Sequence, residues 1–394
     1  MIDGREHHFR LAREVGDRGG GVVGVILGEF ADAARHPHQL QRVDQDARLL
    51  LDALGVWAKV RPVTAPLVAI RLIDDAGHLL RAPEVLFEAA EIGRAAFGAN
   101  VPNTALSLAL AAKVEATAGI AWAAERKVAR LEPAGDGARV ILDDGAQATA
   151  RLVVAADGRH SPCRSGAGIG TRAWDYPQTA IATSFGHSRP HGGVSTEFHR
   201  AAGPCTTVPM PGNASSLVWV EAPAIAKRLM GLDDDAFRAS LETRLAGLLG
   251  TVGEIGPRRA FPLSGLAATE LARNRVALIG EAAHVFPPIG AQGLNLGFRD
   301  VATIAEVVAD AQAGDIGSDA ILARYAAARR TDIGTRTAAV DALNRSLLAD
   351  FLPVQLLRGA GLHLANAAAP VRQWLIRRGL EPVGELPRLM RGGG

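Results

Sequence analysis

The chain has 394 residues, of which 48% are hydrophobic, and a formal net charge of +2. A chain of this length can bury a substantial core, and a fold of two subdomains is expected. The sequence has no run of mixed basic and aromatic residues, which argues against a nucleic-acid partner. Its two cysteines, Cys163 and Cys205, offer neither a disulfide framework nor a metal-ligand spacing.

Three glycines near the N-terminus have the spacing of a dinucleotide-binding loop. Gly19, Gly21 and Gly24 follow the G-x-G-x-x-G pattern, and residues 22–34 can form the helix that follows such a loop. The three glycines are therefore candidate cofactor-binding residues, although a lone glycine pattern is a weak signal.

The segments on either side of these glycines do not fit that fold. Residues 14–18 are not the near-continuous apolar run of a buried parallel strand, and residues 35–42 carry almost no strand character. Asp44 lies twenty positions after Gly24, which is the distance expected of a ribose-binding acid. Because no strand is predicted to carry Asp44, this spacing is interpreted as a coincidence.

The sequence becomes regularly patterned from Leu49 onward. The abrupt change leads to the hypothesis that residues before about Leu49 come from a shifted reading frame or a misassigned start. A native but divergent N-terminus is the alternative.

The middle of the chain predicts a turn, a helix and a hairpin. The turn covers residues 84–97, and the helix covers residues 103–118, where apolar residues recur at helical spacing. Strand-like runs follow around residues 128–131 and 139–142, and Asp-Asp-Gly at 143–145 predicts a hairpin turn.

An apolar run at residues 152–156 predicts a strand that ends in Asp157 and Gly158. Taken alone, this pair is an Asp-Gly turn that closes a strand, which is common. Its meaning depends on whether a second cofactor motif accompanies it.

Between residues 172 and 222 the pattern changes to short strand-like runs separated by turns rich in glycine, proline and serine, which predicts an antiparallel sheet. Strand alternation places Phe198 on one face of the sheet and Glu197 and His199 on the other. The runs cover residues 179–185, 194–199, 206–209 and 216–220.

Three histidines, His187, His191 and His199, lie close together in this region. A metal site is one interpretation. Their spacing across turns matches no compact ligand signature, so solvated loop histidines are predicted instead.

A further helix is predicted over residues 233–250. Asp233, Asp234 and Asp235 give it an acidic first turn that complements the helix dipole. A cluster of catalytic acids is the alternative interpretation.

The segment from Gly280 to Asp300, GEAAHVFPPIGAQGLNLGFRD, has a placement of proline and glycine that a packing helix does not need. Residues 275–279 predict a buried strand before it, and later apolar residues predict a helix that begins near Gly293. The free amides and the positive dipole end of that helix favour an electron-rich or anionic group, which Gly290 and Gly293 allow to come close. An ordinary helix start after a Pro-Pro turn is the alternative.

This segment resembles the second flavin-binding motif of the class A flavoprotein monooxygenases, which have the para-hydroxybenzoate hydroxylase fold, and especially of their ubiquinone-biosynthesis hydroxylase branch. The resemblance implies that Glu281 binds a sugar hydroxyl of FAD and that Pro288 lines the flavin ring. The family's motif begins Gly-Asp, so the extra methylene of Glu281 shifts the carboxylate. The resemblance also places Gly293, Leu294 and Asn295 at the flavin carbonyl. The remaining residues of the implied FAD site are Gly280, Gly290 and Gln292.

The resemblance extends to Asp157 and Gly158, which match the family's Asp-Gly motif close to the flavin, implicated in FAD and NAD(P)H binding. It implies an α/β fold in which a Rossmann-like FAD-binding domain, with a degraded first βαβ unit, is interleaved with an antiparallel-sheet substrate domain that roofs the substrate pocket. C-terminal helices complete it. The expected boundaries are 1–171 and 258–345 for the discontinuous FAD-binding domain, 172–257 for the substrate domain and 346–394 for the helical tail.

The implied reaction depends on the cofactor rather than on an acid–base group of the protein. NAD(P)H reduces FAD, and O2 supplies the oxygen atom that is transferred to an aromatic ring, here a polyprenylated phenol that is a ubiquinone precursor. The helix near Gly293 and an apolar pocket are expected to supply electrostatic stabilisation and to exclude water. No catalytic side chain and no metal is assigned, and His284, although a candidate acid, lies in the flavin-binding motif.

The segment from Arg345 to Gly394 combines aliphatic and aromatic residues with seven arginines and three acids. This composition suits an anionic membrane surface or a partner in a biosynthetic complex, and a helical pair packed on the flavin domain is the alternative. No hydrophobic run is long enough to span a bilayer and no apolar signal core is present. A cytoplasmic protein is expected, with peripheral contact at the inner membrane as an option.

Two other functions remain open. A flavin-fold protein without catalysis could act as a scaffold in a quinone-biosynthesis complex, because the N-terminal FAD-binding unit is incomplete. A related flavoenzyme such as a halogenase or a reductase has less support, since the tryptophan motif of halogenases is absent. The ring position that is hydroxylated, the choice between NADH and NADPH and the oligomeric state do not follow from the sequence.

Overall fold

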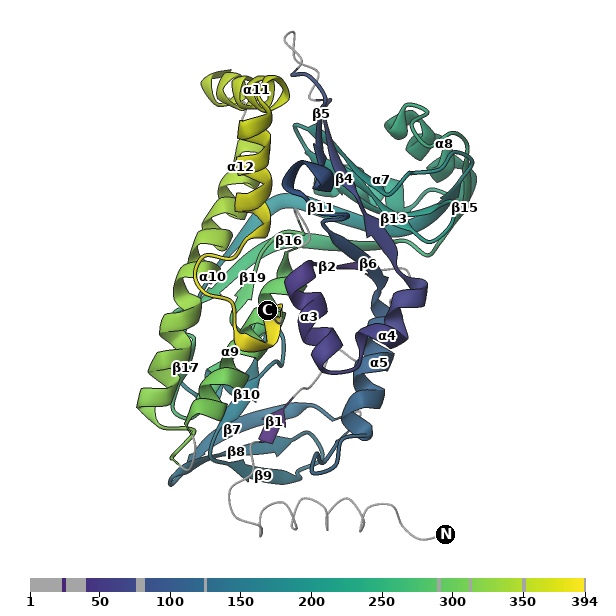
Figure 1. Cartoon of the computed structure of the whole chain (residues 1–394). Coiled ribbons are helices and arrows are strands. Elements are labelled where there is room, and N and C mark those ends of the chain that lie inside the picture. The colour runs from purple at the N-terminus through teal and green to yellow at the C-terminus, as the bar shows by residue number, and fades with distance from the viewer. Residues whose placement is uncertain are drawn as a thin grey trace.

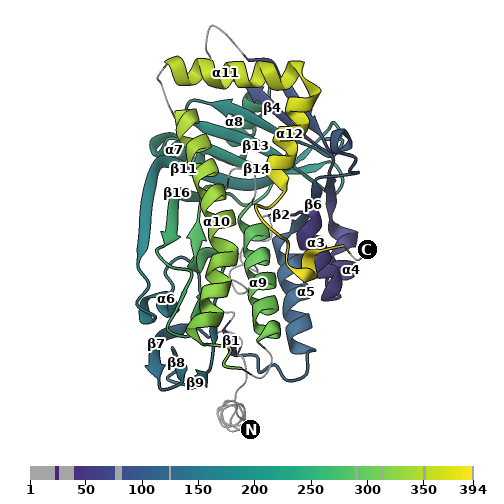
Figure 2. The same ribbon diagram turned by 60° about the vertical axis from the view of Figure 1, so that its left-hand side comes forward.

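The computed structural model describes residues 23–25, 40–75, 82–123, 126–288, 292–311, 314–348 and 352–392. A four-stranded sheet lies in the lower half of the molecule in Figure 1, and a nine-stranded sheet crosses the upper half. Helices α9 (Gly293–Asp310) and α10 (Asp319–Leu348) run side by side from the small sheet toward the large one (Figure 2). The predicted α/β class is confirmed.

The small sheet consists of short apolar strands in the order β1-β10-β18-β17. Its central strands β10 and β18 pair in parallel and contain only valine, alanine and leucine, as a sheet covered on both faces requires. The strands predicted at 152–156 and 275–279 are therefore confirmed, and their carboxyl ends lie at one edge. The bounds are β1 (Val23–Val25), β10 (Val153–Ala155), β17 (Ala272–Arg273) and β18 (Val276–Leu278).

Strand β1 changes the interpretation of the N-terminal glycines. Gly24 lies inside this strand, opposite Val154, rather than in a loop before a helix. The helix expected over residues 22–34 is therefore wrong at its start, because Val23 and Val25 are β-branched residues that pair with β10. Gly19 and Gly21 lie outside the described residues.

A second correction concerns the segment before Leu49. Residues 40–42 were expected to lack strand character, but β2 (Leu40–Val43) pairs with β6 (Gly98–Pro102), which also pairs with β3 (Ala65–Leu67). The partner strand supplies the hydrogen bonds here, so local propensity did not decide the outcome. The hypothesis of a shifted reading frame stays a prediction for the undescribed part of the terminus.

Asp44 has a structural role at the end of β2. Its carboxylate accepts a hydrogen bond of 2.8 Å from the Ala47 backbone amide and so caps helix α3 (Gln45–Ala53). The spacing of Asp44 from Gly24 therefore does not mark a dinucleotide site in this fold.

The helix and hairpin predicted in the middle of the chain are confirmed. Helix α5 (Asn103–Glu115) precedes strands β7 (Val128–Ala134), β8 (Gly137–Leu142) and β9 (Gln147–Ala150). The turn between β8 and β9 contains Gly145, whose φ of 84° is typical of glycine. Three short helices lie in the connections before this region: α4 (Trp57–Val60) and η1 (Arg61–Val63) between α3 and β3, and η2 (Ala89–Ile92) before β6.

The nine-stranded sheet is larger and less regular than predicted. Its strand order is β19-β16-β11-β14-β13-β12-β4-β5, with β15 paired to β11. The strands predicted within residues 172–222 do pair antiparallel, β11 with β14, β14 with β13 and β13 with β12. Strand β12 also pairs in parallel with β4, so the whole sheet is mixed, and four of its strands come from outside residues 172–257. The bounds are β4 (Ala69–Asp74), β5 (Val85–Glu88), β11 (Thr171–His187), β12 (Val194–Arg200), β13 (Gly203–Met210), β14 (Ala214–Glu221), β15 (Val252–Ile255), β16 (Arg259–Ala268) and β19 (His284–Val285).

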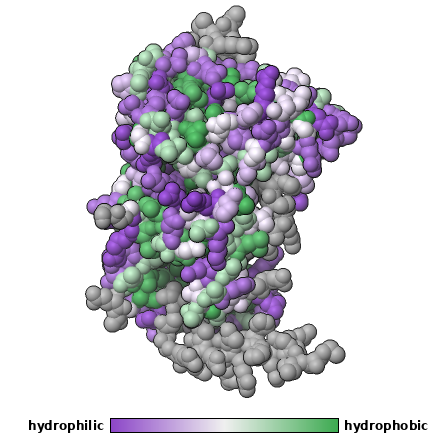
Figure 3. All heavy atoms as spheres, turned by 45° about the vertical axis from the view of Figure 1, so that its right-hand side comes forward, coloured by the Kyte–Doolittle hydropathy of each residue, from purple (hydrophilic) through white to green (hydrophobic). Residues whose placement is uncertain are grey.

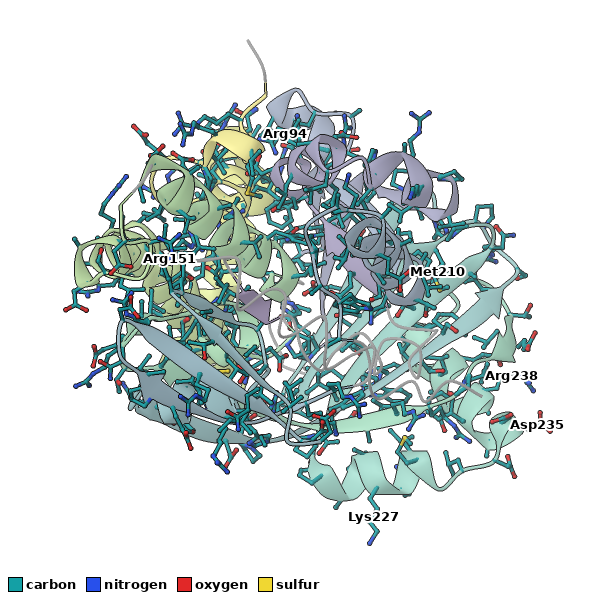
Figure 4. All side chains as sticks on the ribbon, turned by 90° about the horizontal axis from the view of Figure 1, so that it is seen from below. Arg94, Arg151, Met210, Lys227, Asp235 and Arg238 are labelled. Atoms are coloured by element: carbon teal, nitrogen blue, oxygen red, sulfur yellow. The ribbon has the colours of Figure 1, made fainter. Side chains whose placement is uncertain are left out.

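Helices α7 (Pro223–Met230) and α8 (Asp234–Leu245) cover one face of this sheet. Phe198 and Trp219 from the sheet share a buried cluster with Phe237 of α8. Lys227 and Asp235 project away from it into solvent (Figure 4). The covered face is therefore the Phe198 face, and by strand alternation Glu197 and His199 face the other way.

The acidic start of α8 is a helix cap. The Asp233 carboxylate accepts a hydrogen bond of 2.8 Å from the Ala236 amide, which confirms the predicted capping role. The alternative of a catalytic acid cluster finds no support in this geometry.

The C-terminal segment folds back along the molecule as α11 (Leu352–Ala367), α12 (Ala369–Leu380) and η4 (Arg388–Met390). Ile376 packs with Leu67 and Phe97, and Met390 joins the cluster around α3. On the face drawn in Figure 3, apolar residues lie in small patches between polar ones, as on most protein surfaces.

Candidate flavin site

The two predicted cofactor motifs lie side by side at the edge of the small sheet. Asp157 follows β10 and Gly280 follows β18, and these strands are parallel neighbours. The buried guanidinium of Arg164, in helix α6 (Pro162–Gly166), donates to the Ala282 carbonyl at 2.8 Å and to the Arg159 carbonyl at 2.7 Å. One arginine thus fixes the two turns relative to each other.

The Asp157 carboxylate holds the turn after β10. It accepts hydrogen bonds from the Ser161 hydroxyl at 2.5 Å and from the Cys163 amide at 2.9 Å. Gly158 has a φ of 77°, and a Cβ at this position would meet no atom within 4 Å. The aspartate therefore shapes the turn, and the glycine leaves its backbone open to a neighbouring group.

The turn after β18 is built around Gly280. Its φ is 55°, and its amide donates to the Asp300 carboxylate at 3.0 Å. Glu281 is about half exposed, and its Oε2 lies 3.8 Å from Nε of Arg159. The predicted contact of Glu281 with a sugar hydroxyl stays a prediction, and this exposure leaves its carboxylate accessible for one.

Helix α9 begins at Gly293, as predicted. A Cβ at Gly293 would meet no atom within 4 Å, and Leu294 packs toward the α3 cluster. The side chain of Gln292 contacts Arg336 and donates to the Gly379 carbonyl at 3.2 Å. Gln292 therefore ties the helix start to the C-terminal segment.

Asn295 ties the same helix to β2. Its Oδ1 accepts from the Asp44 amide at 3.0 Å, and its Nδ2 donates to the Arg42 carbonyl at 2.8 Å. Among the prolines of the loop, Pro288 is exposed. Gly290 lies outside the described residues.

These residues fit FAD. Gly158, Gly280 and Gly293 come from three elements, and at each of them the space that a side chain would occupy is open. The first turn of α9 adds a positive dipole end. Glycine-lined turns beside a helix start can admit a flat, electron-rich ring system without displacing side chains.

A buried charge network supports this site from behind. Asp300 of α9 accepts hydrogen bonds from Gly280 N, from His284 Nε2 at 2.8 Å and from Arg329 Nε at 2.7 Å. Burial alone would raise the pKa of Asp300, but His284 and Arg329 hold that pKa below its ordinary value. His284 is thus committed to a structural contact.

A second carboxylate extends the network. Asp332 of α10 accepts from Arg329 at 2.9 Å and from Arg336 at 3.0 Å, and Arg299 of α9 lies 3.6 Å away. Burial opposes ionisation of Asp332, yet these arginines lower its pKa. This network is not predicted from the sequence. Its signal was the i, i+3 and i, i+4 spacing of Arg329, Asp332 and Arg336.

The three histidines of the large sheet do not form a metal site. His187 contacts the Arg189 carbonyl and the Ser215 hydroxyl, His191 contacts the Met210 carbonyl, and His199 lies 3.3 Å from Glu197. The prediction of solvated loop histidines is wrong for His187 and His199, which are buried on strands. Within the described ranges, no group of three or more potential ligands could hold a metal ion.

Comparison with known proteins agrees with this geometry. The family described as FAD binding domain matches residues 18–339. Ubiquinone hydroxylase UbiL of Rhodospirillum rubrum is 36% identical over 390 residues, covering 97% of this chain and 90% of that protein. The 3-demethoxyubiquinol 3-hydroxylase of Escherichia coli is 29% identical over 335 residues, or 84% of each chain.

Solved structures show the same fold at low identity. The p-nitrophenol 4-monooxygenase PnpA of Pseudomonas putida has a TM-score of 0.68 at 17% identity and covers 95% of both chains. HpxO of Klebsiella pneumoniae, complexed with FAD and uric acid, has a TM-score of 0.64 at 19% identity, with 84% of this chain and 87% of that chain covered.

The family match over residues 18–339 confirms the predicted FAD cofactor, and NAD(P)H is the co-substrate typical of the family. The joined flavin motifs, the family match over most of the chain and the similarity to hydroxylases across nearly its whole length lead to one conclusion. This chain belongs to the FAD-binding monooxygenases and is a flavin-dependent hydroxylase.

Proposed function

We propose that this enzyme hydroxylates a polyprenylated phenol, a precursor of ubiquinone, with FAD as cofactor and NAD(P)H and O2 as co-substrates. The observation that supports this most directly is the junction of the Asp157 and Gly280 turns beside the open start of α9. The names of the relatives, a ubiquinone hydroxylase and a demethoxyubiquinol hydroxylase, supply the substrate class.

Bound FAD supplies the redox chemistry that passes electrons from NAD(P)H to O2 and one oxygen atom to the ring. The protein's own contribution is positioning and electrostatics. The start of α9 would stabilise negative charge on a flavin bound in front of it, and Asp300 fixes the Gly280 turn against that helix. Asn100 of β6 contacts the Pro209 carbonyl of the large sheet, which would cover the site and limit the access of water, as the family resemblance implies.

The alternative of a scaffold without catalysis is not favoured, because the relatives are named as hydroxylases and the strands that carry the Asp157 and Gly280 turns are parallel neighbours. We expect the purified protein to turn yellow when FAD is added, and to consume NAD(P)H and O2 faster with a short-chain prenylphenol than without it. Measurement needs only absorption spectra and an oxygen electrode. A protein that stays colourless with excess FAD would instead favour the scaffold without catalysis.

We also propose that the C-terminal segment contacts an anionic membrane surface, where such a substrate resides. Leu364, Trp374 and Leu375 are exposed, and the Arg378 guanidinium lies 5.8 Å from the Trp374 ring. Apolar side chains beside arginines suit the boundary of an anionic bilayer. In the part of the chain that the structure describes, no helix is both long and apolar enough to cross a membrane.

Replacing Trp374 and Leu375 together with glutamine is expected to weaken binding to vesicles containing anionic lipid by at least about tenfold, since burial of each large apolar side chain contributes ~1.5–3 kcal/mol. Vesicle co-sedimentation measures this. Leu108→Gln is the matched control, because Leu108 is as exposed but lies on α5. Failure of the unaltered protein to sediment at low salt would remove the proposal.

A further inference from the structure

Two polar residues stand opposite each other where the FAD-binding part meets the large sheet. Arg42 of β2 and Asn100 of β6 are direct antiparallel partners. Side chains opposite each other in such a pair lie on the same face, with Cβ atoms about 5 Å apart. Asn100 Nδ2 donates to the Pro209 carbonyl of β13 at 3.1 Å, so this face points at the large sheet.

Both side chains keep a buried hydrogen-bonding atom without a partner. Asn100 is fully buried, and its Oδ1 accepts no hydrogen bond from any described residue. The Nε of Arg42 is also buried and donates to none of the described residues. The unpaired atom of Asn100 is an acceptor, and the unpaired atom of Arg42 is a donor. Buried polar atoms are nearly always satisfied, so a bound group that supplies both partners is expected here.

The surroundings place this pair next to the expected flavin. The Arg42 carbonyl accepts from Asn295, in the first turn of α9, where the pyrimidine edge is predicted to lie. On the opposite side, Glu197 lies on the face of β12 that α7 and α8 leave uncovered. Burial lowers the pKa of Arg42, and the charges of Asp44 and Glu197 oppose that shift. Arg42 therefore lies between the helix start and the large sheet.

We propose that Arg42 and Asn100 together bind the ring hydroxyl of a phenolic substrate. Asn100 Oδ1 accepts the O–H, and Arg42 Nε donates to the same oxygen. A hydroxyl oxygen can both donate and accept a hydrogen bond, so one hydroxyl can satisfy the unpaired acceptor of Asn100 and the unpaired donor of Arg42. This inference rests on the proposed function, because it specifies how that substrate is oriented.

Three ligands with the same prenyl chain separate the two contacts. The phenol offers donor and acceptor, its methyl ether offers the acceptor alone, and the parent hydrocarbon offers neither. Dissociation constants are measured with the FAD-loaded full chain, from the flavin spectrum, and without FAD, from tryptophan fluorescence. The unaltered protein is expected to bind the phenol about tenfold or more tightly than the ether, and the ether more tightly than the hydrocarbon.

Two variants then assign the contacts. Asn100→Leu is expected to bring the phenol and the ether to nearly equal affinity. Arg42→Met is expected to weaken both by about tenfold and to leave the hydrocarbon unchanged. Gln41→Met is the matched control, because Gln41 is the neighbour in β2 whose side chain lies on the opposite face. Asn100→Leu also loses the contact with Pro209. If this variant does not fold, Arg42→Met alone tests the inference.

The outcomes are distinguishable from failure of the proposed function. If Arg42→Met leaves the order of the three ligands unchanged, the inference is overturned. If it weakens FAD binding and not phenol binding, Arg42 contacts the cofactor and the inference is also overturned. A protein that binds none of the three ligands in either form contradicts the proposed substrate class itself.

Discussion

Replacing Asp300 with alanine is expected to lower the free energy of unfolding by about 3–5 kcal/mol, because the change leaves the buried Arg329 guanidinium without one of its two carboxylates. It also removes the acceptor for the Gly280 amide and for His284. Urea denaturation followed by circular dichroism measures the loss. FAD affinity is expected to fall in parallel, because the Gly280 turn loses its anchor on α9.

The control for this change lies on the same helix. Asp310 pairs with Arg388 at the solvent-exposed end of α9, and the pair is screened by water. Asp310→Ala is expected to leave the unfolding midpoint nearly unchanged. Equal losses from both alanine variants would show that the buried network does not stabilise the fold in the way described here.

Replacing Gly293 with valine is expected to weaken FAD binding by roughly 5- to 150-fold, the equivalent of the ~1–3 kcal/mol that overpacking costs. The fold itself tolerates the change, since a Cβ at Gly293 would meet no protein atom and the residue lies at a helix start. Fluorescence titration with FAD and thermal unfolding of the FAD-free protein separate the two effects.

Gly334 provides a matched comparison. It is also helical and exposed, and a Cβ there would likewise meet nothing within 4 Å, but it lies in the middle of α10. Gly334→Val is expected to bind FAD like the unaltered protein. An FAD affinity unaffected by Gly293→Val would mean that the cofactor does not approach the start of α9.

The flavin motifs could be recognised from the sequence because each is carried by a continuous local pattern. The apolar strand before Asp157, the strand before Gly280 and the helix that begins at Gly293 all depend on residues within a few positions of one another. The acidic cap at Asp233 is local in the same sense. These features lie in the structure where the sequence predicted them.

The tertiary structure alone decided the features that depend on partners distant in the chain. Strand β2 has weak strand propensity and forms because β6 supplies its hydrogen bonds. The parallel pairing of β4 with β12 has no local signature either. Neither Arg42 nor Asn100 lies in a motif that can be recognised in the sequence. They became a candidate binding pair only when strand pairing brought them together and burial left each with an unsatisfied atom, a property that no local pattern encodes.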